Sequence, residues 1–489
     1  MLMILTCFVP MLCGLALFAV PALKNEKRTR NLFTGASMLV MVLLSVLTAL
    51  QGDMSITLFS ITPTLPIVMQ ADALAHFFAI FFSVMWTISG FYAFRYMDHA
   101  KNQSRYFAFY LLTGGALCAL SYAGTMVTMY LFFEAMTLLS VALVLHEMTR
   151  EAIAAGVKYL LYSIAGATMG LLGIFFLTSN SMNAVFTAGG MLNMENLTLS
   201  QNALFIIVLI TLVGFGAKAG LYPLHAWLPT AHPIAPAPAS AALSGVITKA
   251  GVLCIVRILF YVVGADVLRG TWVQYTLIAL AMLTVFMGSM MAYRTDLLKK
   301  RLAYSTVSQV SYVLLGVFML SPTALTGSFL HVIFHSLIKT TLFLAAGAII
   351  HETGKTRVSE LRGIGKEMPV TVWCYTIASL GLIGIPPTGG FVSKWYLAQG
   401  ALSSGTGVLE YLVPAVLLIS ALLTAAYLLP ITIRGFFPGE GYDYASLKKC
   451  ECGKMMVVPM ILCSVLVVLL GMFPGTVMNA IGTIVSSLM

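Results

Sequence analysis

Five basic side chains interrupt the long apolar runs of this sequence: Lys218, Lys249, Arg257, Lys339 and Lys394. A charge at the centre of a membrane costs roughly 2.5–3.5 kcal/mol or more, so charged residues are rare there and usually mark transport paths. Lysine can gain and lose its proton, whereas arginine stays charged. The four deep lysines therefore predict a path for ions, with snorkelling to the lipid headgroups as the competing interpretation. For Arg257, near a helix end, the two interpretations are equally good.

Glu134, in "LFFEAMTLLS", is the only acidic residue well inside an apolar run. An isolated carboxylate is very costly in hydrocarbon, so this residue must be paired or protonated. A lysine on a neighbouring helix is the obvious partner, and we expect Lys218 to be that lysine. A neutral glutamic acid held by hydrogen bonds is the alternative.

The stretch "HVIFHSLIKTTLF" places His331, His335 and Lys339 at positions i, i+4 and i+8. This spacing puts all three on one helix face over about 12 Å. Two histidines four residues apart can bind a metal, but that requires further ligands, and no carboxylate accompanies them. A file of titratable groups favours a proton relay instead. Two histidines bonded to backbone or hydroxyl groups are the alternative.

Two of the lysines stand beside segments that break a helix. Small residues surround Lys218 in "GFGAKAGLYPLHAWLP", and Pro223 follows within five residues. His225 in this stretch either passes protons between the inner side and Lys218 or is a structural loop histidine. Prolines and glycines also precede Lys394 in "GIPPTGGFVSKWYLAQG". Paired breaks of this kind are typical of transporters built from repeats, with the site near the membrane midplane.

The elements that position these residues must be transmembrane helices. The chain has 489 residues, is 60% hydrophobic and 9% charged, and has a mean hydropathy of +0.95, which excludes a soluble globular protein. Hydrocarbon leaves exposed backbone groups without partners, so long apolar runs indicate helices. We expect an all-α polytopic membrane protein of about 14 transmembrane helices, the first of them retained and not a cleaved signal peptide. The expected spans are 2–23, 32–50, 72–95, 105–121, 124–146, 153–178, 202–222, 236–262, 271–293, 301–320, 324–350, 370–399, 411–433 and 456–474.

Basic residues predict the orientation. Loops and helix ends that should share one side hold 21 of the 27 lysines and arginines, and the opposite loops hold only Arg269. Positive residues face the cytoplasm, or the matrix in an organelle, so both termini are expected outside. We expect an integral protein of a bacterial or archaeal cytoplasmic membrane. These loops account for the net charge of +10, so no nucleic-acid partner is needed.

Cofactor motifs are absent from the sequence. It has no iron–sulfur ligand run, Walker A motif or dinucleotide-binding fingerprint. The one close cysteine pair, Cys450 and Cys452, has no further ligands nearby, so free thiols are expected and not a metal site. We expect no cofactor in this chain, and redox cofactors in partner subunits.

At these residues the sequence resembles the antiporter-like subunits shared by respiratory complex I, membrane-bound hydrogenases and Mrp sodium/proton antiporters. The resemblance covers nearly the whole chain and is most specific in "GFGAKAGLYPLHAWLPTAHPIAPAPASAALSGVITKAGVLCIVR". It implies fourteen helices, in which helices four to eight and nine to thirteen form two inverted repeats. Each repeat contains one broken helix, the seventh or the twelfth.

The resemblance also implies roles by position. Glu134 resembles the family's fifth-helix glutamate, Lys218 the seventh-helix lysine, and Lys249 the central eighth-helix residue. Three residues, His331, His335 and Lys339, resemble the family's eleventh-helix relay. Lys394 resembles its twelfth-helix residue, from which the proton leaves to the outside. In the complex I subunit of closest length that last position is often a glutamate. We expect the charge of Lys339, reached through the two histidines, to push a proton from Lys394 to the outside.

The expected organisation is three helices in 1–103, a first inverted repeat in 104–263, a second in 264–433, and a cytoplasmic loop with helix fourteen in 434–489. The expected function is proton translocation by a non-redox subunit of a multi-subunit, redox-driven pump of the complex I or hydrogenase type. Its partners would be other membrane subunits, including further antiporter-like subunits and a redox module. A subunit of an Mrp-type sodium/proton antiporter is the alternative. An independent solute transporter or channel is disfavoured, because a charged file without a substrate-sized pocket suits ions.

Overall fold

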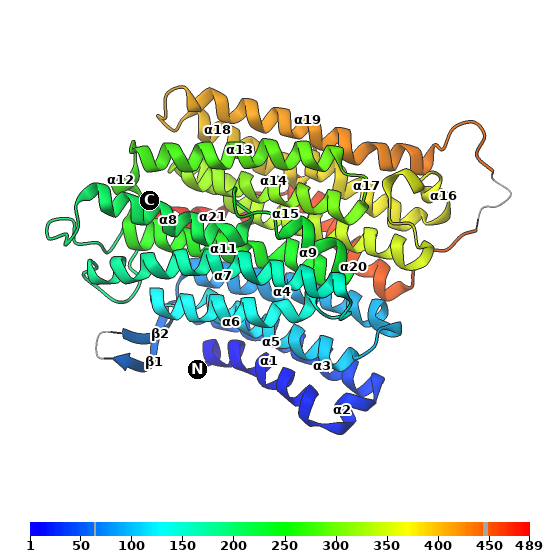
Figure 1. Cartoon of the computed structure of the whole chain (residues 1–489), viewed down its shortest axis with the longest axis horizontal. Helices are drawn as coiled ribbons and strands as arrows, with labels where there is room; N and C mark the ends of the chain where they lie inside the picture. The colour runs from blue at the N-terminus through cyan, green and yellow to red at the C-terminus, as the bar shows by residue number, and fades with distance from the viewer. Residues whose placement is uncertain (63–64, 444–447) are drawn as a thin grey trace.

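The structure, a computed structural model of the whole chain, describes residues 1–62, 65–443 and 448–489. Long helices lie side by side along one direction (Figure 1). Both termini lie at one end of these helices, together with the β1–β2 hairpin, and α2 and α16 lie at the other end (Figure 1). The second end carries the basic loops, for example Lys24 in α2 and Lys366 in α16, and we call it the basic end.

The elements, in chain order, are α1 (Leu2–Ala19), α2 (Pro21–Asn25), α3 (Lys27–Leu50), β1 (Met54–Thr62), β2 (Leu65–Ala71), α4 (Ala73–Tyr96), η1 (Met97–His99), α5 (Gln103–Ser121), α6 (Met126–Val144), α7 (Arg150–Ser179), α8 (Gln201–Ala219), α9 (Leu228–Ile234), α10 (Ala237–Ala242), η2 (Leu243–Ile247), α11 (Thr248–Val256), η3 (Arg257–Val263), α12 (Ala265–Leu268), α13 (Trp272–Arg294), α14 (Leu298–Phe318), α15 (Pro322–Thr353), η4 (Val358–Glu360), α16 (Ile364–Glu367), α17 (Pro369–Ile383), α18 (Gly389–Leu402), α19 (Leu409–Phe436), α20 (Lys454–Met472) and α21 (Gly475–Leu488).

The predicted helical membrane fold is confirmed. Eleven helices in the described ranges are long and apolar enough to cross a membrane. The expected spans 105–121, 301–320 and 370–399 fall on α5, α14 and the α17–α18 pair, which are not among the eleven. The count of fourteen spans and the division into two repeats therefore stay predictions.

Short polar side chains define where several of the helices begin. The side chains of Asp72, Thr125, Thr149, Ser200 and Thr271 accept a hydrogen bond from the backbone N–H three residues on, at the starts of α4, α6, α7, α8 and α13. Such caps satisfy backbone donors that have no partner within the helix. This matters most in a membrane, where water does not replace the missing partners.

The β1–β2 hairpin and α21 are among the elements that were not expected from the sequence. β1 and β2 form an antiparallel hairpin, in which Met54 pairs with Ala71. The hairpin packs on the α5–α6 connection, because Gln70 N–H donates to the carbonyl of Tyr122 at 2.7 Å and Gly124 N–H donates to that of Val68 at 2.9 Å. The helix α21 follows the last expected span and packs against α15.

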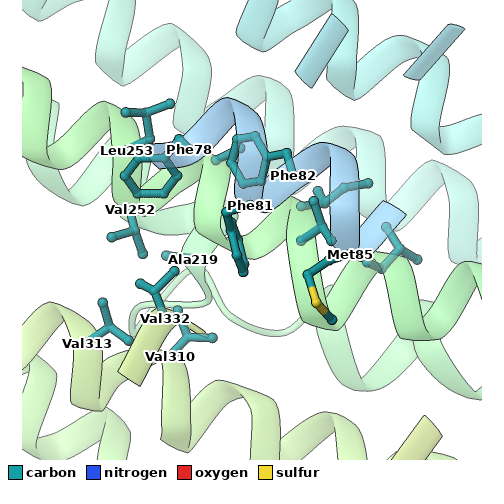
Figure 2. Close-up of a cluster of buried hydrophobic side chains, with 14 of the residues drawn as sticks. Phe78, Phe81, Phe82, Met85, Ala219, Val252, Leu253, Val310, Val313 and Val332 are labelled. Atoms are coloured by element: carbon teal, nitrogen blue, oxygen red, sulfur yellow. The ribbon is translucent and has the colours of Figure 1, made fainter. Parts of the chain in front are cut away.

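The most buried helices are the ones that carry the central titratable residues. The apolar window of 237–263 is 100% buried and that of α15 is 89% buried, against 33% for α1 and α19. Figure 2 shows part of the surrounding core, where α4, α8, α11, α14 and α15 meet. Its labelled residues are Phe78, Phe81, Phe82, Met85, Ala219, Val252, Leu253, Val310, Val313 and Val332. Lys249 on α11 and the histidines of α15 are thus enclosed by protein and not by lipid.

Candidate functional site

Lys218 lies in the last turn of α8, buried, and is held by hydroxyl groups of α7. Its Nζ donates to the Tyr159 hydroxyl at 2.8 Å and to Ser163 Oγ at 3.1 Å. Nζ also lies 4.4 Å from the centre of the Tyr159 ring. The Tyr159 hydroxyl is 2.7 Å from Ser140 Oγ on α6, so a chain of hydroxyls joins the lysine to a third helix. Sequence reasoning missed these partners, because each is an ordinary hydroxyl on a separate helix.

Glu134 lies on α6 and is half-buried. The carboxylate interacts electrostatically with Lys218. No hydrogen bond or ion pair joins the two side chains in the described part of the chain, and the Lys218 donors point to Tyr159 and Ser163 instead. Glu134 and Lys218 thus interact through their charges without direct contact. That the two residues are coupled in function stays a prediction.

The first break separates α8 from α9. Gly220 ends α8 with φ +83°, a conformation that favours glycine, and a Cβ at this position would collide with Leu228 Cδ1. The indole of Trp227 donates to the carbonyl of Ala217 at 2.9 Å, so the chain folds back on the helix end. His225, half-buried in this break, stacks on Tyr222 at a ring-centre distance of 5.8 Å. The structure records no contact between His225 and Lys218 among the described residues, so its role as a proton donor stays a prediction.

Lys249 connects the two halves of the chain. Its Nζ donates to the carbonyl of Ser244 at 2.7 Å and lies 2.8 Å from Nδ1 of His335 on α15. Ser244 belongs to the π-helical segment η2, directly before α11. A π-helical turn shifts the backbone hydrogen bonds by one residue and is common at functional sites. The fully buried lysine thus contacts the expected histidine relay directly.

The histidines continue the file along α15. The rings of His331 and His335 stack with centres 5.7 Å apart, as the i, i+4 spacing predicts. Nδ1 of His331 lies 2.9 Å from Ser393 Oγ on α18, and its ring stacks on Tyr312 at 5.5 Å. Among the described residues, the Nε2 atoms of both histidines are buried without a protein partner, so each ring has one nitrogen open to a further hydrogen bond.

Lys394 ends the file beside the second break. Its Nζ donates to the carbonyls of Leu382 at 2.5 Å and Ile383 at 3.0 Å, at the end of α17, and lies 5.0 Å from the centre of the Tyr312 ring. Carbonyls at a helix C-terminus lack intrahelical donors and favour a cation. Gly390 allows the two half-helices to approach, because a Cβ at this position would collide with the carbonyl oxygen of Gly381.

Lys339 has a different place from the one expected. Its Nζ donates to the carbonyl of Leu302 on α14 at 3.0 Å, one turn beyond His335 towards the basic end. The residue beside Lys394 is His331, because the three α15 residues follow each other along the helix and His331 is the one whose ring stacks on Tyr312. The expected push of Lys339 on Lys394 is therefore wrong in its geometry. Lys339 instead lies on the side of the file that faces the basic end.

His232 is a buried histidine that sequence reasoning overlooked. It is 0% exposed, and its ring stacks on Phe343 of α15 at 4.9 Å. Neither ring nitrogen has a hydrogen-bond partner in the ranges that the structure describes. It interacts electrostatically with Lys299, Lys339 and Lys249. The sequence feature that could have indicated this residue is its place in "PTAHPIAP", where prolines flank a histidine inside an apolar stretch.

Arg257 is not a snorkelling residue. Its guanidinium binds Asp72, the N-cap of α4, through contacts of 2.5 and 2.9 Å, and it packs over the Tyr261 ring at 4.4 Å. A bidentate pair of this kind keeps arginine charged and fixed. This residue ties α4 to the start of η3 and lies outside the file.

The described residues contain no cluster of histidine, cysteine and acidic side chains that could hold a metal ion, and Cys450 and Cys452 are free thiols. Glu451 between them caps α17: its Oε2 accepts the backbone N–H of Val370 at 2.8 Å, and its Oε1 accepts the Thr371 hydroxyl. The two cysteines thus flank a residue that caps a helix.

Comparison with known proteins gives consistent matches. The profile of the family described as "NADH:quinone oxidoreductase/Mrp antiporter, TM" matches residues 123–424. One subunit of the NADH-quinone oxidoreductase of Desulforudis audaxviator is 35% identical over 389 residues, covering 76% of this chain and 75% of that protein. One subunit of the Na(+)/H(+) antiporter of Bacillus subtilis is 28% identical, covering 89% of this chain and 87% of that protein.

A solved structure has the same fold. A chain of the Mrp complex from Dietzia sp. DQ12-45-1b superposes with a TM-score of 0.86 at 21% identity, covering 100% of this chain and 98% of that chain. The matched family segment contains Glu134, the two breaks and every residue of the file from Lys218 to Lys394.

Proposed function

Because this chain belongs to the NADH:quinone oxidoreductase/Mrp antiporter transmembrane family, we propose that it is the proton-translocating subunit of a multi-subunit, redox-driven membrane pump. Other membrane subunits, including further antiporter-like subunits, would surround it. The redox cofactors would reside in a partner module, whose signal reaches this chain as a change of charge or conformation. The basic end would face the cytoplasm, and both termini would lie outside.

One observation carries the proposal: a file of titratable side chains crosses the buried centre of the chain. It runs from Lys249 through His335 and His331 to Lys394, with 2.8 Å between the first pair and stacked rings between the second. Tyr312 fills the space between His331 and Lys394. Groups that alternate between donor and acceptor in this order can pass a proton from one helix to the next.

Protons would enter and leave this file through the following predicted residues. Lys218, close to the first break and modulated by the charge of Glu134, would load the path, with His225 as the candidate donor. Lys339 would accept protons at the inner end of the histidine pair. Lys394, beside the second break, would release them to the outside.

The test is pumping by the assembled complex in proteoliposomes, with Lys249→Met compared with Lys249→His. The methionine has a similar length but cannot carry a proton, so proton transfer should stop while the electron-transfer modules still assemble. The histidine titrates and should keep part of the activity. Full pumping by Lys249→Met would show that this lysine is structural and would refute the proposed route.

A subunit of an Mrp-type sodium/proton antiporter is the second candidate, because the Bacillus subtilis relative and the Dietzia structure come from such systems. Copurification in mild detergent separates the two. A hydrogenase or quinone-reducing module would support the redox-driven pump, and small antiporter subunits without redox proteins would support the second candidate.

A further inference from the structure

A second polar file lies between α14 and α19 and is not part of the proposed route. One face of α14 carries a stripe of polar residues: Arg301, Ser305, Ser308, Gln309 and Tyr312. This stripe starts in the first turn of α14 at the basic end and rises by about 16 Å to Tyr312 at 1.5 Å per residue.

The lower half of this file joins α14 to the C-terminal half of α19. Arg301 donates to the carbonyl of Tyr427 at 2.8 Å. The Tyr427 hydroxyl lies 2.7 Å from Ser305 Oγ and donates to Thr424 Oγ1 at 3.2 Å. Thr424 in turn donates to the carbonyl of Ser420 at 2.7 Å. These groups are buried and form a polar line through an apolar region, which ends at the carbonyl of Ser420.

The upper half is a cluster of three serines from three helices. Ser289 Oγ on α13 lies 2.8 Å from Ser308 Oγ and 2.6 Å from Ser420 Oγ. The hydroxyl of Tyr312 donates to the carbonyl of Leu417 at 2.8 Å. The ring of Tyr312 contacts both His331 and Lys394, so the second file ends at the exit of the first.

Gln309 gives an independent indication that water belongs in this file. The residue is 0% exposed, and within the described part of the chain neither Oε1 nor Nε2 has a partner of hydrogen-bond geometry, although the amide lies close enough to the Tyr312 hydroxyl to interact with it. Tyr375 on α17, which packs against α19, is also 0% exposed, and its hydroxyl has no partner of hydrogen-bond geometry in the described ranges, although it interacts with Ser379. Buried polar atoms are rarely left unsatisfied, and ordered water is their usual partner. Interhelical packing alone would explain the serine pairs but not an amide without partners.

We propose that the face of α14 from Arg301 to Tyr312, with Ser420, Thr424 and Tyr427 of α19, is a hydrated branch that carries protons from the basic end to Lys394. This branch rests on the proposed proton-translocating function. It would reload Lys394 from the inner side, while the charge that moves along the central file drives release from Lys394, so pumping would need both. Gln309 would hold the water that connects its two halves.

Proton transfer along the branch leaves every group as it was. Each water or hydroxyl accepts one proton from the neighbour on the inner side and gives another to the neighbour on the outer side, so one proton enters and one leaves. The carbonyl of Ser420, which accepts from Thr424, has no proton to give. A water at Gln309 is therefore required where the hydroxyl chain is interrupted. A second water must make the last transfer to Lys394, because Tyr312 faces this lysine with its ring and its hydroxyl donates to Leu417.

The experiment measures proton translocation by the assembled complex in proteoliposomes. Gln309→Leu removes the amide and keeps a similar size, and replacing unsatisfied polar atoms with carbon should not destabilise the fold. We expect translocation to fall about tenfold, the effect of roughly one lost hydrogen-bonded step. Ser328→Ala is the matched control, because Ser328 is buried and donates to Val313 of α14 at 2.9 Å, outside the branch. It should keep the wild-type rate.

If Gln309→Leu fails to assemble, Tyr427→Phe takes its place, because it removes only the hydroxyl between Ser305 and Thr424. Wild-type translocation by the assembled variant, together with loss of translocation in Lys394→Ala, would overturn the branch and leave the proposed function intact. Wild-type translocation in both would overturn the branch and the proposed exit together.

Discussion

Replacing Tyr159 by phenylalanine tests how Lys218 is controlled. The hydroxyl of Tyr159 accepts from Lys218 Nζ at 2.8 Å and lies 2.7 Å from Ser140 Oγ. The phenylalanine keeps the ring face, which lies 4.4 Å from Nζ. The substitution therefore removes one charge-assisted hydrogen bond and leaves the cation–π contact and the packing in place.

The size of the effect follows from these contacts. A hydrogen bond to a charged group contributes about 1.5–3 kcal/mol. If all of it acts on the step in which Lys218 changes its charge, the rate changes by about ten- to a hundredfold. Ser163, the second partner at 3.1 Å, remains available, so we expect a value near the lower end.

The assay is proton pumping by the assembled complex in proteoliposomes, normalised to the amount of complex. Tyr110→Phe is the matched control, because that hydroxyl is also buried and donates to the carbonyl of Trp86 at 2.6 Å, away from every lysine of the file. We expect pumping to fall in Tyr159→Phe and to persist in Tyr110→Phe. Equal rates in the two variants would refute the idea that hydroxyls of α7 control Lys218.

Three further predictions concern other residues. Alanine at Glu134 or Lys218 should abolish pumping without loss of assembly, and purely additive effects in a double-mutant cycle would exclude their coupling. Lys394→Ala should stop proton release, whereas Lys394→Glu should retain part of it because glutamate also titrates; pumping at the wild-type rate by Lys394→Ala would place the exit elsewhere. Burial raises the pKa of the Cys452 thiol to about 11, so the reactive thiolate is scarce at pH 7. Labelling with iodoacetamide should therefore speed up as pH rises from 7 to 9, and a pH-independent rate would contradict this.

Much of the fold could be predicted because a membrane restricts the length and composition of the helices that cross it. The lengths of the apolar runs indicated the helices, and prolines and glycines indicated the two breaks. The β1–β2 hairpin was missed because its segment is short and lies at the ends of helices, where this restriction does not apply. Helix α21 was missed because its 14 residues are fewer than a membrane span requires.

Which titratable residues lie inside the protein could be predicted from the sequence, but their contact partners could not, and the role of these residues in ion transport stays a prediction. The i, i+4 spacing on α15 determines which side chains share a face, so the His331–His335 stack could be predicted from the sequence. The contacts of Lys249 with His335, and of Lys218 with Tyr159, depend on how separate helices lie against each other. The order of Lys339 and Lys394 depends on the same packing, so the members of the file were predictable while their order along it was not.

The chemistry of the partners separates the lysines of the file from the structural arginine. Lys218 binds hydroxyls, Lys249 a carbonyl and an imidazole, and Lys394 two carbonyls. None of these partners carries a charge of its own, so a lysine can release its proton without leaving a buried anion behind. Arg257 has the opposite arrangement, because loss of either charge in its pair with Asp72 would leave the other uncompensated at a cost of about 3–5 kcal/mol. Neutral partners suit groups whose charge must change, and a carboxylate partner suits one whose charge must not. By this criterion Glu134 can influence Lys218 only from a distance, because direct contact would hold the lysine in its charged state.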